Sequence, residues 1–181
     1  NKVQKLILIG TGVSYPESAP IPLKEDYIWD GYPEKVAAPY GLAGRIIMAL
    51  SQAYREQYGF NSIYLILSNL YGPEDHFEKD KAHVIPSLIK KIEEASLNNH
   101  SITVWGSGKA SREFLYVKDA AKAIIMAMKN YDKSSIVNIG SGMEITIKEL
   151  VEKIAKNMGY KGEILWETEK PEGQLRRYFD S

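Results

Sequence analysis

Two hydroxyl-bearing residues stand where α/β proteins often place reacting groups. Thr11 directly follows the apolar run 5–10, and Tyr40 begins a segment whose apolar residues repeat at helical spacing. A hydroxyl at a strand end can hydrogen-bond a substrate oxygen, although it equally suits a turn residue that caps the strand. A tyrosine at a helix start can transfer a proton, because the helix dipole favours the phenolate. A half-buried structural tyrosine is the more common case, so neither residue alone indicates a catalytic site.

The elements that would position these residues alternate along the chain. Strands are expected over 5–10, 61–67, 136–139 and 163–166, and helices over 40–58, 84–97, 119–130 and 146–158. The first strand is expected to be buried on both faces, and 102–105 and 112–117 are expected to pair as a hairpin around Gly106-Ser-Gly108. The capping-box pattern that begins at Thr146 opens the last helix. This alternation predicts an α/β fold with a mostly parallel sheet.

The segments outside these elements carry two further expectations. The Pro-rich stretch 11–38 is long for a loop, and its aromatic residues favour an ordered functional loop over disorder. A central-type strand almost at the start, and no closing element at the end, favour a fragment of a longer α/β protein. The alternative is a small complete domain.

Composition excludes several classes of protein. The chain has 181 residues, with 23 basic and 23 acidic side chains, so no net charge attracts it to nucleic acid or an anionic membrane. It has no cysteine, which excludes disulfides, thiolate metal sites and a cysteine nucleophile. No apolar stretch approaches the roughly 20 residues that span a bilayer, and no signal-peptide pattern is present. We therefore expect no nucleic-acid or membrane partner and no metal. Composition leaves the compartment open, and the location that we expect is cytoplasmic.

Longer motifs identify a family. They are Gly10-Thr-Gly-Val-Ser-Tyr-Pro16, Pro39-Tyr-Gly-Leu-Ala43, Ser68-Asn-Leu-Tyr-Gly-Pro73, Ala82-His-Val-Ile-Pro86, Val104-Trp-Gly-Ser-Gly108, Arg112-Glu-Phe-Leu115, Asn138-Ile-Gly-Ser-Gly142 and Lys170-Pro-Glu-Gly173. Together they resemble the extended short-chain dehydrogenase/reductase (NAD-dependent epimerase/dehydratase) family, and most narrowly its GDP-L-fucose synthase branch. The resemblance covers nearly all of the chain and places it in the C-terminal part of the family's length.

The resemblance implies a fold and a cofactor. It implies the later strands of a Rossmann-type parallel sheet over 1–72 and a smaller α/β substrate-binding domain over 73–181, with helix 119–130 able to pack back on the sheet. The cofactor would be NADP or NAD. The family's N-terminal dinucleotide-binding portion is absent, because Gly10-Thr-Gly12 lacks the third glycine of a pyrophosphate-binding turn.

The resemblance also implies roles for individual residues. The catalytic residues would be Thr11, which holds a 4-keto oxygen, Tyr40 as general acid, and His83 as the second acid/base of an epimerisation. The cofactor-binding residues would be Gly10, Thr11, Tyr40, Ser68, Asn69, Leu70 and His83. A nucleotide diphosphate-sugar, GDP-linked by resemblance, would contact Asn69, Lys91, Trp105, Arg112 and Lys170. A homodimer is also implied.

Two departures from the family pattern leave several functions open. The lysine of Tyr-x-x-x-Lys is replaced by Gly44, and Arg45 at the next position is expected to point about 100° away from the Tyr40 face. The catalytic cysteine position holds Val13, which cannot transfer a proton. One reading is a GDP-4-keto-6-deoxy-mannose epimerase-reductase with impaired or modified activity, or a truncated part of one. The others are a non-catalytic nucleotide-sugar-binding or protein-interaction domain, and a different sugar-nucleotide 4-epimerase or dehydratase.

Overall fold

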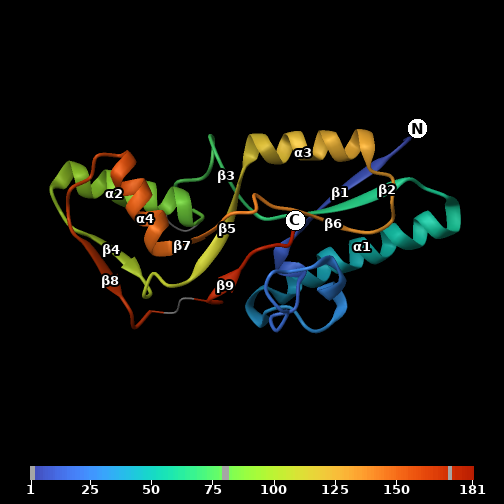
Figure 1. Cartoon of the computed structure of the whole chain (residues 1–181), viewed down its shortest axis with the longest axis horizontal. Helices are drawn as coiled ribbons and strands as arrows, with labels where there is room; N and C mark the ends of the chain where they lie inside the picture. The colour runs from blue at the N-terminus through green and yellow to red at the C-terminus, as the bar shows by residue number, and fades with distance from the viewer. Residues whose placement is uncertain (1–2, 79–81, 171–172) are drawn as a thin grey trace. The chain divides into compact units, whose positions relative to one another are not determined.

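The computed structural model describes residues 3–78, 82–170 and 173–181, which form two compact units (Figure 1). Unit 1 comprises Asn1–Leu70, Glu113–Met143 and Tyr178–Ser181, and unit 2 comprises Tyr71–Arg112 and Glu144–Arg177. The strands are β1 (Leu6–Thr11), β2 (Ser62–Leu67), β3 (Asn69–Tyr71), β4 (Ile102–Trp105), β5 (Ser111–Tyr116), β6 (Val137–Ile139), β7 (Glu144–Thr146), β8 (Ile164–Glu167) and β9 (Arg176–Arg177). The α-helices are α1 (Ala38–Tyr58), α2 (Val84–Asn98), α3 (Val117–Asn130) and α4 (Ile147–Asn157).

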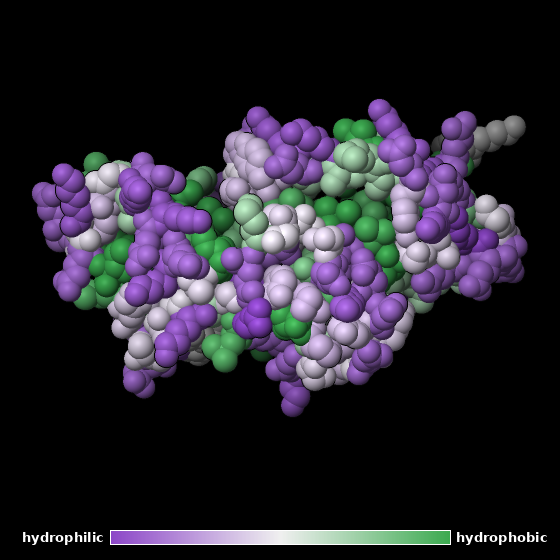
Figure 2. All heavy atoms as spheres, in the orientation of Figure 1, coloured by the Kyte–Doolittle hydropathy of each residue, from purple (hydrophilic) through white to green (hydrophobic). Residues whose placement is uncertain are grey.

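Unit 1 is built on a parallel three-stranded sheet in the order β1-β2-β6. Figure 1 shows α1 and α3 on opposite sides of these strands. All six residues of β2 are buried, as its apolar composition and central place require. The expectation that β1 is buried on both faces is wrong, since Leu6 and Ile9 are 38% and 50% exposed. The reason is that β1 is an edge strand among the described strands, and Figure 2 shows apolar surface in unit 1 between α3 and α1.

A buried arginine and a buried asparagine order the long segment between β1 and α1. Arg45 donates from Nε to the Ser14 carbonyl and from Nη1 to the Gly31 carbonyl, both at 2.7 Å, and its guanidinium lies 5.6 Å from the centre of the Trp29 ring. Asn138 of β6 accepts a hydrogen bond from the Tyr15 hydroxyl at 2.8 Å. Burial lowers the pKa of Arg45 and raises that of Tyr15. The loop is therefore ordered, as its aromatic content predicts.

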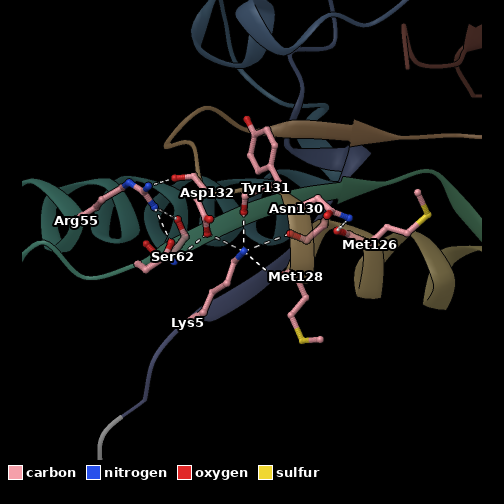
Figure 3. A network of polar contacts seen from close by, with 10 residues as sticks. Lys5, Arg55, Ser62, Met126, Met128, Asn130, Tyr131 and Asp132 are labelled. Carbon is pink, nitrogen blue, oxygen red and sulfur yellow. Dashed lines mark hydrogen bonds and ion pairs between the residues drawn. The ribbon is translucent and has the colours of Figure 1, made fainter.

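Lys5 joins the start of β1 to the end of α3 in unit 1 (Figure 3). Its ammonium donates to the carbonyls of Met128 at 2.7 Å and Tyr131 at 2.6 Å, and it forms an ion pair with Asp132 at 2.9 Å. A cation at a helix C-terminus satisfies carbonyls that have no partner within the helix. A hydrogen bond from Asn61, and then the Lys5 ammonium, hold the pKa of Asp132 below its usual range.

Unit 2 pairs its strands differently from the expected hairpin. β4 pairs in parallel with β8, and β5 pairs with β7 and with β9, so the prediction that β4 and β5 form a hairpin is wrong. The segment between them bends at Gly106 and Gly108, whose φ values are +83° and +74°, and the Gly108 carbonyl accepts from Lys148 N–H at 3.0 Å. This connection thus lies against the start of α4 and separates β4 from β5.

The start of α4 confirms the capping box. The Glu149 N–H donates to Thr146 Oγ1 at 3.1 Å, and the Thr146 N–H donates to Glu149 Oε2 at 2.9 Å. The hydrogen bonds that the Thr146 N–H and then the Thr146 hydroxyl donate to the Glu149 carboxylate lower the pKa of Glu149. Each of these contacts depends on residues within one turn, which is why the pattern could be read directly.

The division of the chain in space differs from a cut between residues 72 and 73. Unit 1 also takes residues 113–143 and 178–181, because β6 pairs with β2 and because Leu67, Leu115 and Ala120 form one buried cluster. Helix α3 accordingly belongs to unit 1. Within the described ranges, no helix is long and apolar enough to cross a membrane.

Candidate active site

The carboxyl edge of the unit 1 sheet carries the first group of predicted residues. Thr11 is the last residue of β1 and lies opposite Leu67 of β2, so Thr11 and Ser68 belong to the same edge. Thr11 Oγ1 accepts a hydrogen bond from the Val13 N–H at 3.3 Å, which is the capping role of a turn residue. Its hydroxyl proton is still free to be donated to another oxygen. The structure therefore shows the capping role of Thr11, and its role in binding remains a prediction.

The turn after Thr11 packs on the first turn of α1, which carries Tyr40. A Cβ built on Gly41 would lie 2.6 Å from the Val13 carbonyl oxygen, closer than any real side chain approaches. Glycine at this position allows the 12–14 segment and the first turn of α1 to touch. Tyr40 itself is 64% exposed. The two hydroxyl-bearing segments are therefore neighbours in unit 1, and Tyr40 is open to a ligand.

The residues after β2 fit a polar ligand group at this edge. The Ser68 hydroxyl is buried and has no hydrogen-bond partner within the described part of the chain, while its N–H donates to the Ile139 carbonyl at 3.0 Å. The Asn69 side-chain amide donates to the Glu113 carbonyl at 2.9 Å. Leu70 is 40% exposed and offers an apolar surface. An unsatisfied buried hydroxyl beside an exposed leucine suits a group that is polar at one edge and flat, such as a nicotinamide.

Arg45 is the cation nearest in sequence to the missing lysine, and it does not replace it. Its guanidinium hydrogen-bonds the carbonyls of Ser14 and Gly31 and is only 6% exposed. The expectation that Arg45 would turn away from Tyr40 is consistent with this engagement in the loop. Residue 44 is a glycine and supplies no ammonium.

Unit 2 brings together three of the residues predicted to contact a nucleotide sugar. The ammonium groups of Lys91 and Lys170 lie 5.9 and 5.7 Å from the centre of the Trp105 ring. Trp105 is 61% exposed, and Lys91 is held by a hydrogen bond of 3.1 Å to the Thr103 carbonyl. Two cations beside an exposed aromatic face can bind a ligand that combines an anion with a flat ring.

Arg112 and His83 are the remaining predicted residues of unit 2. Arg112 lies on β5, half-buried, with Nη1 donating to the Ser111 carbonyl at 2.7 Å. A Cβ on Gly173 would lie 3.6 Å from Arg112 Nη2, so Gly173 comes close to this guanidinium. Residues 171 and 172 of the same motif lie outside the described residues. His83 is exposed and takes the N-cap position of α2, without a side-chain capping bond.

Glu113 is a residue that the sequence reasoning missed. Its carboxylate is completely buried in unit 1 and accepts from the N–H groups of Gly142 at 2.7 Å and Phe179 at 3.0 Å. It thereby joins β5 to the 140–142 turn and to the C-terminal segment. In a strand, residues two apart point to the same face, so Glu113 shares the face of Ser111 and Leu115. All three are buried in the structure, and their spacing was the signal that could have indicated a buried carboxylate. Among the described residues, no group of His, Cys, Asp and Glu could hold a metal ion.

A parallel sheet with hydroxyl side chains at its carboxyl edge is typical of nucleotide-binding α/β proteins, and the second unit by itself places two cations beside an exposed tryptophan. Residues 1–140 match the model of the NAD dependent epimerase/dehydratase family, and the chain belongs to that family.

The similar proteins include GDP-L-fucose synthases and a GDP-linked sugar reductase. The chain is 41% identical over 180 residues to the probable GDP-L-fucose synthase 1 of Oryza sativa subsp. japonica, an alignment that covers 99% of this chain and 55% of the rice protein. The structure superimposes on NADP-bound GDP-L-fucose synthetase from Naegleria fowleri with a TM-score of 0.90 at 28% identity, covering 98% of this chain and 58% of that one. The structure superimposes on a GDP-6-OMe-4-keto-L-xylo-heptose reductase from C. jejuni with a TM-score of 0.91 at 32% identity, covering 98% of this chain and 63% of that one. The family resemblance and the α/β fold class are thus confirmed, and the chain spans somewhat more than half the length of these relatives.

Proposed function

We propose that this chain supplies the reacting hydroxyls and the nucleotide-sugar-binding residues of an NADP- or NAD-dependent epimerase/reductase that acts on a GDP-linked keto sugar. The observation that carries the proposal is the pair of ammonium groups, from Lys91 and Lys170, on the exposed ring of Trp105. A diphosphate would lie between the two cations, and the ring would receive the base or the sugar by stacking. The GDP part rests on similarity to GDP-L-fucose synthases.

Each hydroxyl has a role that its position supports. Thr11 donates a hydrogen bond to the 4-keto oxygen, and Tyr40 gives that oxygen a proton as the carbonyl becomes an alcohol. His83 exchanges the proton of an epimerisation. Gly10, Ser68, Asn69 and Leu70 would hold a nicotinamide, which when bound would supply the hydride, and the unsatisfied Ser68 hydroxyl supports this role. Arg112 and Asn69 complete the contacts to the sugar nucleotide.

Two residues indicate weaker or different chemistry than that of the fucose synthases. Val13 has no proton to exchange, so His83 lacks a partner for epimerisation. Gly44 supplies no ammonium to the tyrosine or to a ribose. A 4-reductase without an epimerase step needs no group at residue 13, and the likeness to a heptose reductase favours this second candidate. Binding of a nucleotide sugar without turnover is the third, favoured by Gly44.

The assembly we propose is a homodimer through α1. Ile47, Leu50, Tyr54 and Tyr58 are each 47–65% exposed and follow one another at helical spacing, so they form one apolar face. A second copy of the chain would cover this face. Light scattering should report a dimer for the wild type and a monomer for Leu50→Glu, and a monomeric wild type would contradict this part. A cytoplasmic location belongs to the same proposal and is tested by cell fractionation.

Calorimetry with GDP-mannose tests the binding site. Removing one charged contact is expected to weaken binding about 10–100-fold, so Arg112→Ala and Lys91→Ala should each lose that much affinity. Trp105→Ala should also weaken binding, and UDP- and dTDP-sugars should bind less well. Lys161→Ala removes a charge from another exposed lysine of unit 2 and serves as the control. Undiminished affinity in both Arg112→Ala and Trp105→Ala would contradict the proposed site.

An assay of NADPH oxidation tests the predicted loss of activity. With GDP-4-keto-6-deoxy-mannose, the full-length protein should turn over far more slowly than the rice relative measured beside it. An equal rate would show that Gly44 and Val13 do not impair the reaction.

A further inference from the structure

The space beside Gly44 is filled by two hydroxyl side chains. A Cβ built on Gly44 would lie 2.6 Å from Ser14 Oγ and 3.3 Å from the Tyr64 hydroxyl oxygen. The first distance is shorter than real Cβ contacts, and the second is at the tight end of their range. The lysine of the family pattern is therefore not simply missing at residue 44, because Ser14 Oγ occupies the space that the first atom of its side chain would enter.

Tyr64 is held in this place from both sides. It lies on β2, is 4% exposed, and donates its hydroxyl to the Gly44 carbonyl at 3.0 Å. On the other side, a Cβ on Gly10 would lie 2.6 Å from the same hydroxyl oxygen, so the ring requires glycine at residue 10, while a Cβ on Gly44 would only crowd it. The phenol thus bridges the end of β1 and the start of α1.

The pKa of Tyr64 reports which groups surround this phenol. Burial raises the pKa of Tyr64, and the charge that Tyr40 would carry raises it further. Tyr64 therefore stays a neutral hydrogen-bond donor, and it is close enough to Tyr40 for their charges to interact.

Ser14 completes the packing at Gly44. It is 2% exposed, and its hydroxyl has no hydrogen-bond partner within the described residues. Its carbonyl is fixed by the Arg45 guanidinium, so the residue cannot easily move away from the helix. Arg45 and Ser14 thus act together, since Arg45 holds Ser14 against Gly44.

We propose that Ser14 and Tyr64 take the place of a side chain at residue 44, and that Tyr64 is a positioning residue that holds the first turn of α1, and with it Tyr40, against Gly10 at the end of β1. Only the role of Tyr40 in this statement rests on the proposed function; the packing stands by itself. It follows that restoring lysine at residue 44 requires changes at residues 14 and 64 as well.

Melting temperatures test the packing. Alanine is a better helix former than glycine, so Gly44→Ala should stabilise a helix with free space around it. Here we expect the Tm to fall by about 3–10 °C, as overpacking does. The double variant Ser14→Gly with Gly44→Ala should recover most of that loss. Gly44→Lys should be less stable than Gly44→Lys combined with Ser14→Gly. An unchanged Tm in Gly44→Ala, or no recovery when Ser14 is removed, would overturn the proposal.

Fluorine NMR of the protein labelled with 3-fluorotyrosine tests the positioning role. Tyr64→Phe keeps the ring but breaks the hydrogen bond to Gly44, so the Tyr40 resonance should shift. Tyr40→Phe should lower the titration midpoint of Tyr64, because the Tyr40 charge contributes to raising it. Tyr58→Phe, an exposed position at the far end of α1, should change neither signal. The proposal would be overturned if Tyr64→Phe left the Tyr40 resonance unchanged, or if Tyr40→Phe left the titration midpoint of Tyr64 unchanged.

These measurements need no ligand, so they separate this inference from the proposed function. If GDP-mannose fails to bind while Tyr40 and Tyr64 still respond to one another, the function is wrong and the positioning of the helix is right. If GDP-mannose binds while the two tyrosines are independent, the positioning is wrong and the function stands.

Discussion

Glu113 offers the sharpest test of how unit 1 is held together. Its buried carboxylate accepts two backbone N–H groups, from Gly142 at 2.7 Å and Phe179 at 3.0 Å, and the Ser141 hydroxyl at 3.4 Å. In Glu113→Ala these donors lose their acceptor. Leaving a buried donor unsatisfied costs about 1–3 kcal/mol. The Phe179 N–H is buried and the other donors are partly buried, so we expect a total loss of about 2–4 kcal/mol in the free energy of unfolding.

Thermal unfolding and hydrogen exchange would measure this effect. For a chain of this size, the loss corresponds to a fall in Tm of about 4–16 °C. Glu113→Gln keeps one acceptor oxygen and should lie between the wild type and Glu113→Ala. Glu56→Gln removes an exposed carboxylate from α1 and should leave the Tm unchanged. Exchange should accelerate most at the amides of Gly142 and Phe179. A Glu113→Ala protein with the Tm of the wild type, or with uniform acceleration of exchange, would refute the reasoning.

Three further predictions concern local features. Lys5→Met should lower the free energy of unfolding by about 1–3 kcal/mol, because removing this largely buried ammonium leaves carbonyls at the end of α3 without a donor. Lys133→Met, at an exposed position, should leave the stability unchanged, and equal Tm values for the two variants would contradict the prediction. A hydrogen bond from Arg176, and then one from Ser111, lower the pKa of Glu144 below its ordinary value of 4.5. The ionised Glu144 therefore stabilises the fold above pH 4.5, and this stabilisation is lost as the pH falls through the lower pKa of the folded state. Acid should therefore destabilise the wild type more than Glu144→Gln, and parallel pH curves of Tm would exclude this. Gly59→Ala should lower the free energy of unfolding by about 1 kcal/mol, because the φ angle of +64° strains an alanine although its Cβ would meet no other atom. A Tm at or above that of the wild type would contradict this prediction.

Several features of the fold could be predicted from sequence because their causes lie within a few residues. The apolar run 61–67 is the buried strand β2, the helix that Gly59 ends is α1, and Thr146 caps α4 as its motif indicates. The hairpin prediction failed because the partner of β4 is β8, which lies far along the chain and is chosen by packing. The burial of β1 failed for a similar reason, since it depends on which strands lie on both of its sides.

The candidate site divides in the same way. The sequence identified the class of residues, since Thr11, Tyr40, Trp105 and their motifs indicate the family, which the similar proteins confirm. It did not show that the ammonium groups of both lysines lie near the Trp105 ring, because Lys91 and Lys170 come from segments far apart in the chain.

By itself the sequence determined the family, the α/β alternation and the absence of a lysine at residue 44 and of a cysteine at residue 13. Only the tertiary structure decided what stands in their place. Ser14, Gly44 and Tyr64 belong to a short 3-10 helix, an α-helix and a strand, and no spacing along the chain relates them. Backbone patterns are set by neighbours in sequence, whereas the atoms that fill a given volume are set by the packing of all the elements that meet there.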